Sequence, residues 1–440
     1  MLNLYKAKPK ASLLGKTFTF HIDDSDYEVH GISKHQQKIA FVTAALPGEK
    51  VQAKVLEDKA GFLKATTVKV LEASARRVTP PCSYATQCGG CQLQHISATS
   101  QRELKQQGID KLIRHQTGLT SLPWQLMLTA ADSGYRRRAR IGVWFDKKQR
   151  RLSVGFRQAA DKHIVAIAHC MVLSPLLAPV FKVLNNVLSQ LKDPTVITHA
   201  EVLEADGKAF VILRHIKAVT GTEQQLFVDA WPEAVWLGEA EPGVFHYWQQ
   251  PVVPQYQLAE QQLSLQFAPD DFIQVNAALN QQMVTQAVNW LNISANDTVL
   301  DLYSGIGNFT LALAQRAKMV QAVEGVAKMV QQLATNVKLN GLSNVEAHQA
   351  DLHLVWPKAQ WNKPVYTKVL LDPARAGAQG AIEQIVKLKP AQILYVSCNA
   401  ATFARDARVL LQSGYKLDKI CGVDMFTHTS HLELMALFSR

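Results

Sequence analysis

The sequence has no stretch of apolar residues long enough to cross a membrane. Its most apolar region, residues 165–188, is interrupted by a histidine, two prolines and a lysine, so no run reaches the roughly 18 residues that a spanning helix needs. The first six residues also lack the charged head and apolar body of a signal peptide. With 48% hydrophobic and 19% charged residues, the 440-residue chain has the composition of an ordinary globular protein. These features predict a cytoplasmic protein of two or three domains that does not bind a membrane.

Cysteine is scarce, and six residues at uneven spacing do not fit a disulfide framework. Three of the six nevertheless lie within ten residues, as Cys82, Cys88 and Cys91, and the last two flank a Gly-Gly pair. Several thiolates are tolerated side by side only when a cation compensates them, and glycines let the backbone fold tightly around a metal centre. Zinc sites usually pair two C-x2-C segments, so this single segment favours an iron–sulfur cluster over zinc. A fourth ligand would come from a distant cysteine, either Cys170 or Cys421.

Acidic residues are few in the first part of the chain. Residues 1–160 contain 26 Lys and Arg against 12 Asp and Glu, whereas the remaining residues contain 21 against 24. This asymmetry predicts that the N-terminal part approaches a polyanion such as RNA, while the C-terminal part has a different task. Alternation along a strand would turn Arg136, Arg138 and Arg140 to one face, where they suit phosphate binding and base stacking.

Residues 8–72 alternate apolar and polar side chains in short segments separated by turn signals. Strands are expected at residues 17–22, 38–42, 51–55 and 65–70. Short alternating strands over about sixty residues predict a small OB-like β-barrel. Its lysines would contact phosphates: Lys6, Lys8, Lys10, Lys16, Lys34 and Lys38. A helix is expected over residues 94–116, and an α+β arrangement follows from about residue 152 to 263.

Three apolar strands in the C-terminal part are each followed by residues typical of a binding or catalytic site. They are expected at residues 299–302, 369–371 and 393–396. The first runs into a turn at Gly305–Gly307, and Glu324 follows nineteen residues after Gly305, at the spacing that lets an acidic side chain bind ribose hydroxyls. The second ends at Asp372 and the third at Cys398. Because open α/β sheets bind ligands at the carboxyl ends of their strands, Cys398 is predicted to be a nucleophile rather than a buried thiol.

Five segments occur in an order that resembles the RNA (uracil-5-)-methyltransferases, which use S-adenosylmethionine. They are residues 271–276, 301–310, 371–377, 397–406 and 428–433. The whole chain is most similar to the bacterial branch of the family that acts on 23S rRNA. Two positions depart from the family pattern, because Ser304 stands where cysteine is usual and Ala400 where proline is usual. Neither carries the expected chemistry.

The resemblance implies an α/β protein of three domains, with residue roles to match. It implies an RNA-binding TRAM barrel of OB type at residues 8–72, a central α+β iron–sulfur domain at 73–263 and a Rossmann-like class I methyltransferase domain at 264–440. It makes Cys398 the nucleophile and Glu433 the base. The residues expected to bind S-adenosylmethionine are Gln274, Tyr303, Asn308, Glu324, Asp351 and Asp372. The expected ligands of a [4Fe-4S] cluster are Cys82, Cys88, Cys91 and Cys170, which leaves Cys421 as a core residue.

The implied activity is methylation of C5 of one uracil in 23S rRNA, with uracil-1939 as the expected target and a monomeric enzyme. Because C5 of uracil is a poor nucleophile, a thiolate must first add to C6, and a base must later remove the C5 proton so that the thiolate can leave. A target base inside a stack must be flipped out. The alternatives are another uracil in 23S rRNA or tRNA, although the tRNA branch lacks the cysteine cluster, and a non-catalytic RNA-binding iron–sulfur protein.

Overall fold

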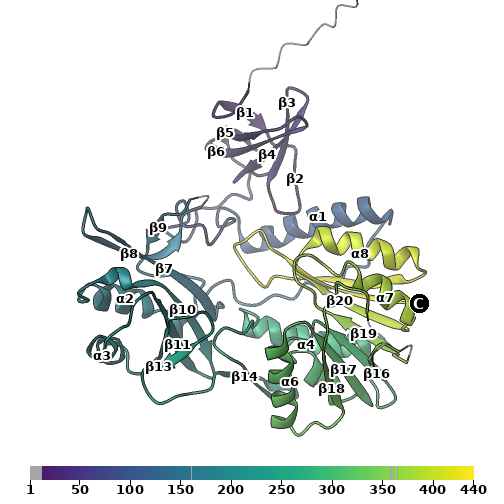
Figure 1. Ribbon diagram of the computed structural model, residues 1–440. Coiled ribbons are helices and arrows are strands. Elements are labelled where there is room, and N and C mark those ends of the chain that lie inside the picture. The colour runs from purple at the N-terminus through teal and green to yellow at the C-terminus, as the bar shows by residue number, and fades with distance from the viewer. Residues whose placement is uncertain (1–11, 160, 357–358, 360, 364) are drawn as a thin grey trace, which may run out of the picture. The chain divides into compact units, whose positions relative to one another are not determined.

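The computed structural model describes residues 12–159, 161–356, 359, 361–363 and 365–440 (Figure 1). The first residues of the expected barrel, with Lys8 and Lys10, and also Lys6 lie outside this part of the chain. Contacts divide the protein into two compact units, one with the described residues up to Pro81 and Gln92–Lys111, the other with Cys82–Cys91 and Leu112–Arg440. Within the described residues, no helix is both long and apolar enough for a membrane span. The cytoplasmic location and the monomeric state remain predictions.

The first unit is built on a six-stranded sheet with the order β1-β5-β6-β4-β3-β2. Its strands are β1 (Thr17–His21), β2 (Asp24–Ser25), β3 (Gly31–His35), β4 (Lys38–Thr43), β5 (Lys50–Asp58) and β6 (Phe62–Glu72). Alternating side chains form its core around Phe20, Val42, Val51 and Leu63. All four predicted strands are present. The two that were not predicted, β2 and β3, are rich in polar residues, which hide the alternation.

The helix expected over residues 94–116 is α1 (Ala98–Thr117), which begins four residues later than predicted. The hydroxyl of Ser97 accepts a hydrogen bond from the Ser100 N–H, as an N-cap does. Before it, the Gln101 side chain donates to the carbonyls of Leu93 and Ile96 and so holds that segment in a turn. This side-chain pairing is not visible in the apolar periodicity.

The second unit begins with a seven-stranded sheet in the order β13-β12-β11-β10-β7-β8-β9. Its strands are β7 (Arg138–Asp146), β8 (Arg151–Arg157), β9 (Ile164–Ala166), β10 (Ile197–Ala205), β11 (Lys208–His215), β12 (Val235–Glu239) and β13 (Phe245–Tyr247). Two helices, α2 (Val180–Leu188) and α3 (Gly221–Ala230), and two short 3-10 turns, η1 (Pro175–Leu177) and η2 (Pro194–Val196), accompany it. Phe181 and Phe227 of the helices share an apolar cluster with Trp236 of the sheet. The α+β prediction for this region is confirmed.

A second seven-stranded sheet has the order β18-β17-β16-β19-β20-β22-β21. Its strands are β16 (Thr298–Leu302), β17 (Met319–Glu324), β18 (Val345–Gln349), β19 (Lys368–Leu371), β20 (Gln392–Ser397), β21 (Lys416–Val423) and β22 (Glu433–Ser439). The strands β16 to β20 pair in parallel, and β22 is antiparallel to β20 and β21. The order reverses beside β16, which creates the crevice where open α/β sheets bind ligands. The Rossmann-like prediction is therefore confirmed.

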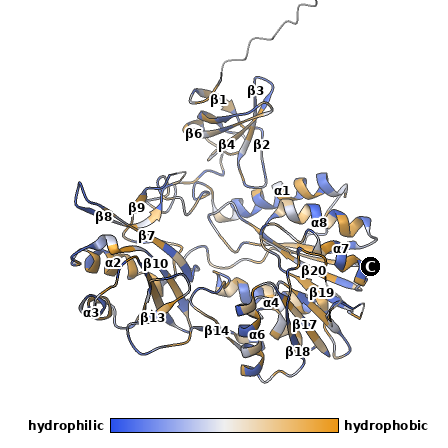
Figure 2. Ribbon diagram, in the orientation of Figure 1, coloured by the Kyte–Doolittle hydropathy of each residue, from blue (hydrophilic) through white to orange (hydrophobic). Residues whose placement is uncertain are grey.

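Helices cover both faces of this sheet, with α4 and α6 on one face and α7 and α8 on the other (Figure 1). They are α4 (Ala277–Leu291), α5 (Thr310–Ala314), α6 (Ala327–Leu339), α7 (Ala381–Leu388) and α8 (Ala400–Gln412). The central strands β16, β19 and β20 are almost fully buried. Figure 2 colours the sheet by hydropathy and shows hydrophobic residues along these strands. Strands buried on both faces read as continuous apolar runs, which is why the sequence revealed them.

The two sheets of the second unit share a core. They are connected by a hairpin. Its strands are β14 (Gln255–Leu258) and β15 (Leu263–Gln266), and the turn η3 (Ala259–Gln261) joins them. One apolar cluster includes Leu203 and Phe210 of the first sheet, Leu265 of the hairpin and Leu370 of the second sheet. The domain boundary expected between residues 263 and 264 falls inside β15. The domain limits remain predictions.

Candidate active site

Six of the eight predicted catalytic and cofactor-binding residues come to one edge of the second seven-stranded sheet. Asp351, Glu324, Tyr303, Asp372 and Cys398 lie at or just after the ends of β18, β17, β16, β19 and β20, which are neighbours in that order. Glu433 is the first residue of β22. Because β22 runs antiparallel to β20, its start lies at the same edge as the ends of the parallel strands.

Cys398 and Glu433 are neighbours across two strands. Ser397, the last residue of β20, pairs with Leu434, so Cys398 directly follows this pair on one side and Glu433 directly precedes Leu434 on the other. Burial raises the pKa of the Cys398 thiol, the charges of Glu433 and Asp372 raise it further, and Arg375 lowers it. The free site therefore keeps this cysteine protonated at neutral pH, and the thiolate must be generated when substrate binds.

Glu433 is buried, and its Oε2 accepts no hydrogen bond from the described residues. Burial, followed by the charge of Asp372, raises the pKa of the Glu433 carboxyl to about 8. Burial also raises the pKa of Asp372 to about 7. A carboxyl group with a pKa near the working pH can both hold and accept a proton during a reaction, which suits a general base.

The loops that carry Asp372 and Cys398 are tied together by a buried carboxylate. Asp406 of α8 accepts hydrogen bonds from the Tyr395 hydroxyl at 2.7 Å and from the Ala378 N–H at 2.8 Å. Directly after Cys398, the side chain of Asn399 caps α8 by accepting from two backbone N–H groups. The cysteine therefore stands between a paired strand and a capped helix, where its backbone is fixed.

The glycine turn after β16 also has the geometry that its sequence predicted. Tyr303, Gly305 and Gly307 have φ values of 61°, 55° and 102°, in the left-handed region that favours glycine. The Gly305 N–H donates to Glu324 Oε2 at 3.1 Å, and the Val326 N–H donates to Oε1 at 2.9 Å. These bonds hold the Glu324 carboxylate at the end of β17, beside the turn.

Three predicted cofactor ligands differ in how many hydrogen bonds their side chains already make within the protein. They are Gln274, Asn308 and Asp351. Gln274 is buried, and its Oε1 accepts no hydrogen bond from the described residues. Asn308 exchanges two hydrogen bonds of 2.9 Å with Asn280 and accepts a third from the Tyr256 hydroxyl. Asp351 is exposed and accepts from the His353 N–H. Asn308 therefore holds its loop against α4, and all three remain predicted cofactor ligands.

Two residues of this edge were given no role by the sequence. Asp301, in β16, is buried, accepts a hydrogen bond from the Thr310 hydroxyl at 2.5 Å, and has its pKa raised to about 7 by burial. Arg375 acts on the pKa of Cys398, and its Nη2 lies 3.1 Å from His431 Nε2. Both stand inside segments that carried the family resemblance, but local sequence does not reveal burial or long-range contact.

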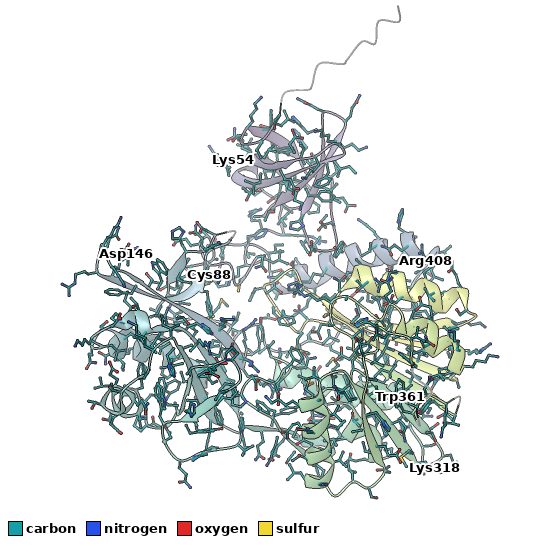
Figure 3. All side chains as sticks on the ribbon, in the orientation of Figure 1. Lys54, Cys88, Asp146, Lys318, Trp361 and Arg408 are labelled. Atoms are coloured by element: carbon teal, nitrogen blue, oxygen red, sulfur yellow. The ribbon has the colours of Figure 1, made fainter. Side chains whose placement is uncertain are left out.

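The four cysteines expected to bind a cluster belong to the same unit. In the loop of Cys82–Cys91, Cys88, which Figure 3 labels, pairs with Gln158, the residue after β8. Burial raises the pKa of Cys88, and the charges of Cys170 and Cys82 raise it further. Burial and Cys82 likewise raise the pKa of Cys170, although it receives backbone N–H groups of Val172 and Leu173. Several thiolates with such mutual repulsion need a bound cation, as a metal cluster provides.

The described residues include one group of metal-ligating side chains whose ligand atoms all lie within 4.8 Å of one another, namely Asp26, Glu28 and His30. The kind of metal centre that the cysteines hold stays a prediction, in which the single C-x2-C segment favours a [4Fe-4S] cluster over zinc. Cys421 is instead buried in β21, where its sulfur accepts from Gln286.

The run of arginines at the start of β7 makes several hydrogen bonds to other parts of the protein. Arg138 donates to the carbonyls of Pro269 and Asp271 and to Glu201. Arg137 is buried and donates to the Gln274 carbonyl at 2.8 Å. Arg140 is exposed. The guanidinium of Arg138 therefore holds the segment before α4, and the RNA-binding role of Arg136, Arg138 and Arg140 stays a prediction.

Comparisons with known proteins agree on one family. The family model described as tRNA (Uracil-5-)-methyltransferase matches residues 99–351 and 360–440, and the TRAM domain model matches residues 11–68. The 23S rRNA (uracil(1939)-C(5))-methyltransferase RlmD of Mannheimia succiniciproducens is 41% identical over 444 residues, with 100% of each chain covered. The protein of the same name from Photorhabdus laumondii is 42% identical over 429 residues, with 96% of each chain covered.

A solved structure shares the fold over almost the whole chain. It is the Pyrococcus abyssi tRNA (uracil-54, C5)-methyltransferase in complex with S-adenosyl-L-homocysteine. The TM-score is 0.75 at 22% identity, with 96% of this chain and 99% of that chain covered. The likeness confirms the arrangement of an N-terminal barrel followed by a Rossmann-like domain.

Proposed function

The chain belongs to the tRNA (uracil-5-)-methyltransferase family, and we propose that it transfers the methyl group of S-adenosylmethionine to C5 of one uracil in 23S rRNA. The observation that carries the proposal is that Cys398 and Glu433 both adjoin the Ser397–Leu434 pair, at the edge where the sheet binds ligands, and that the charge of Glu433 acts on the Cys398 thiol. A nucleophile and a base side by side are what methylation of an unreactive ring carbon requires.

Cys398 acts as the nucleophile and Glu433 as the base. Cys398, once deprotonated, adds to C6 of uracil, and the electron pair of the C5–C6 bond moves toward C5. C5 then attacks the sulfonium methyl group, and S-adenosylhomocysteine leaves. Glu433 removes the proton that C5 still carries, and the electrons of that C–H bond re-form the double bond and expel the Cys398 thiolate. The raised pKa of Glu433, about 8, makes it a stronger base than an exposed carboxylate.

S-adenosylmethionine would bind along the neighbouring strand ends. Glu324 would accept hydrogen bonds from the ribose hydroxyls, and Asp351 would lie on the adenine side, because β18 is the next strand outward. Tyr303 and Gln274 would contact the cofactor, Asn308 would approach it from the glycine turn, and Asp372 would line the space between cofactor and target base.

The choice of 23S rRNA over tRNA rests on the curated relatives. Those named as 23S rRNA methyltransferases match over 96% to 100% of this chain at 41% to 42% identity. The target would be uracil-1939, as in the names of those relatives. We also propose that Cys82, Cys88, Cys91 and Cys170 hold a [4Fe-4S] cluster, which supplies the positive charge that four adjoining thiolates require.

The proposal is tested by methyl transfer from labelled S-adenosylmethionine to 23S rRNA that lacks the modification, with total tRNA as the competing substrate. We expect incorporation into 23S rRNA at a single uracil, identified as 5-methyluridine by nuclease mapping. Incorporation into tRNA instead, or into several uracils, would refute the proposed substrate.

The first unit should contribute affinity for RNA through exposed lysines. Lys16, Lys34, Lys54 and Lys69 are exposed and form no ion pair with the described part of the chain, whereas Lys38 is paired with Asp58. Replacing the four by glutamine should weaken RNA binding and lower the slope of log K against log salt by up to about 3, because each phosphate contact releases counterions. Replacing Lys387 of α7 and Lys389, its C-cap, by glutamine serves as the control for a loss of lysine charge outside the first unit. An unchanged slope would count against the barrel as an RNA contact.

A further inference from the structure

The second unit contains a cavity of about 630 Å³ that none of the predicted site residues lines. Its walls come from the segment before β7, from the start of η1, from the end of β10, from β14 and from the first residues of α4. The lining residues that can recognise a ligand are Tyr135, Arg137, Ser174, Glu204, Tyr256 and Asn276. The roles assigned to the catalytic and cofactor-binding residues therefore leave the function of this cavity open.

Two residues of the lining each carry a donor for which the described part of the chain offers no acceptor. Arg137 is 6% exposed and Asn276 is 1% exposed. Arg137 Nη2 and Asn276 Nδ2 are buried and have no hydrogen-bond partner among the described residues. A buried donor without an acceptor costs free energy, so a site with two of them is unusual unless a ligand completes it.

The other ends of both side chains are fixed. Arg137 Nε donates to the Gln274 carbonyl at 2.8 Å, and its guanidinium lies over the Tyr256 ring at 4.7 Å. Asn276 is the N-cap of α4, where its Oδ1 accepts from the Leu279 N–H at 3.2 Å. The two unused donors are therefore held in place rather than free to turn toward solvent, which is how a preformed binding site behaves.

The cavity also carries acceptors and negative charge. Glu204 lines it and accepts a hydrogen bond from the Ser174 hydroxyl, and Asp206 lies at the same wall. Two carboxylates would repel a phosphate group. They favour a ligand that offers acceptors and donors side by side, and the edge of a nucleobase does so. Tyr135 and Tyr256 have their hydroxyls bonded to Thr427 and Asn308, so they add ring surface to the lining.

We propose that this cavity binds a second nucleobase of the RNA substrate, with an acceptor of the base bonded by Arg137 and Asn276 and an amino group bonded by Glu204. Adenine and cytosine present that combination on their Watson–Crick edges. The inference rests on the proposed function and extends it, because the enzyme would select its uracil partly by the identity of a neighbouring base. It also assigns a task to the central sheet, which supplies Glu204.

Two variants test the site without disturbing its framework. Asn276→Asp keeps the oxygen that caps α4 and replaces the donor by an acceptor. Glu204→Gln keeps the shape and removes the carboxylate. Asp229→Asn, on the exposed side of α3, is the control for the same loss of one negative charge. Thermal unfolding of each protein shows whether it is folded.

The measurement is the steady-state kinetics of methylation on a fragment of 23S rRNA. We expect Asn276→Asp and Glu204→Gln each to raise KM for RNA about tenfold, as loss of a base-specific hydrogen bond does, with kcat changed less than about threefold. The affinity for S-adenosylmethionine and the kinetics of Asp229→Asn should match those of the unaltered protein.

A series of RNAs identifies the base. Each nucleotide near the target is replaced in turn by an abasic one, and binding is measured by fluorescence anisotropy without S-adenosylmethionine. One position other than the target should lose about tenfold in affinity for the unaltered protein and little further for Glu204→Gln, because the two changes remove the same contact. Additive losses at every position, or an effect confined to salt dependence, would overturn the inference.

These experiments distinguish a failure of the proposed function from a failure of the proposed base-binding cavity. Base-specific coupling to Glu204 in a protein that transfers no methyl group would refute the proposed function and support the cavity. Normal methylation of 23S rRNA with no coupled nucleotide would do the reverse.

Discussion

Glu433→Gln protein, mixed with S-adenosylmethionine and 23S rRNA, should accumulate a covalent enzyme–RNA species that survives a denaturing gel. The substitution keeps the shape of the side chain and removes its ability to take the C5 proton. Attack by Cys398 and methyl transfer do not need that base, so both should proceed. The adduct then cannot break down, because the thiolate leaves only as the C5 proton is removed. Loss of a general base lowers the rate by about 10²–10⁴-fold, which is slow enough for the adduct to be seen.

Two controls separate the roles of the pair. Cys398→Ala should abolish methylation and form no adduct, alone or combined with Glu433→Gln. Omission of S-adenosylmethionine should prevent the stable species, because the electron pair on an unmethylated C5 returns to the C5–C6 bond and expels the thiolate. An inactive Glu433→Gln protein that folds normally and gives no adduct would mean that Glu433 acts before methyl transfer, or only as a structural residue of β22.

Cys170→Ala protein, purified without oxygen, should lack the metal cluster that we propose for the unaltered protein. The reason is the charge coupling between Cys170, Cys82 and Cys88, which shows that the distant cysteine lies with the cysteine loop. Cys421→Ala is the matched control, because that thiol is buried in β21 and accepts from Gln286. Iron and acid-labile sulfide should reach about four per chain in the unaltered protein and in Cys421→Ala.

Two results would contradict the assignment of a [4Fe-4S] cluster with Cys170 as its fourth ligand. One zinc ion per chain with no sulfide would replace the cluster by a zinc site. Retention of the cluster in Cys170→Ala with its loss in Cys421→Ala would show that the fourth ligand was wrongly chosen.

The sequence could predict those parts of the site that follow directly from a strand. Glu324, Asp372 and Cys398 each lie at the end of an apolar run, and parallel strands place such ends together without any knowledge of distant contacts. The position of Glu433 is different, because it depends on β22 entering the sheet antiparallel beside β20. Only the resemblance to a family linked that residue to Cys398.

Where a contact could not be predicted from the sequence, a partner distant in the chain was decisive. Alternation predicted a face of Arg136, Arg138 and Arg140 for RNA, but Arg138 is taken by carbonyls more than a hundred residues away. Arg137, which alternation assigned to the other face, is the arginine with an unused buried donor. In the same way, the first turn of α1 is displaced by the Gln101 side chain, a contact that periodicity does not encode.

The most direct test of the account is to locate the bond between enzyme and RNA. A 23S rRNA fragment with 5-fluorouridine at the target carries fluorine where Glu433 must find a proton, so the methylated adduct should persist in the unaltered protein. After protease and nuclease digestion, mass spectrometry should find a 5-fluoro-5-methyl nucleotide attached to the peptide that contains Cys398. Attachment to another residue, or complete absence of a linked peptide under conditions of active methylation, would contradict the assignment of Cys398 as the nucleophile.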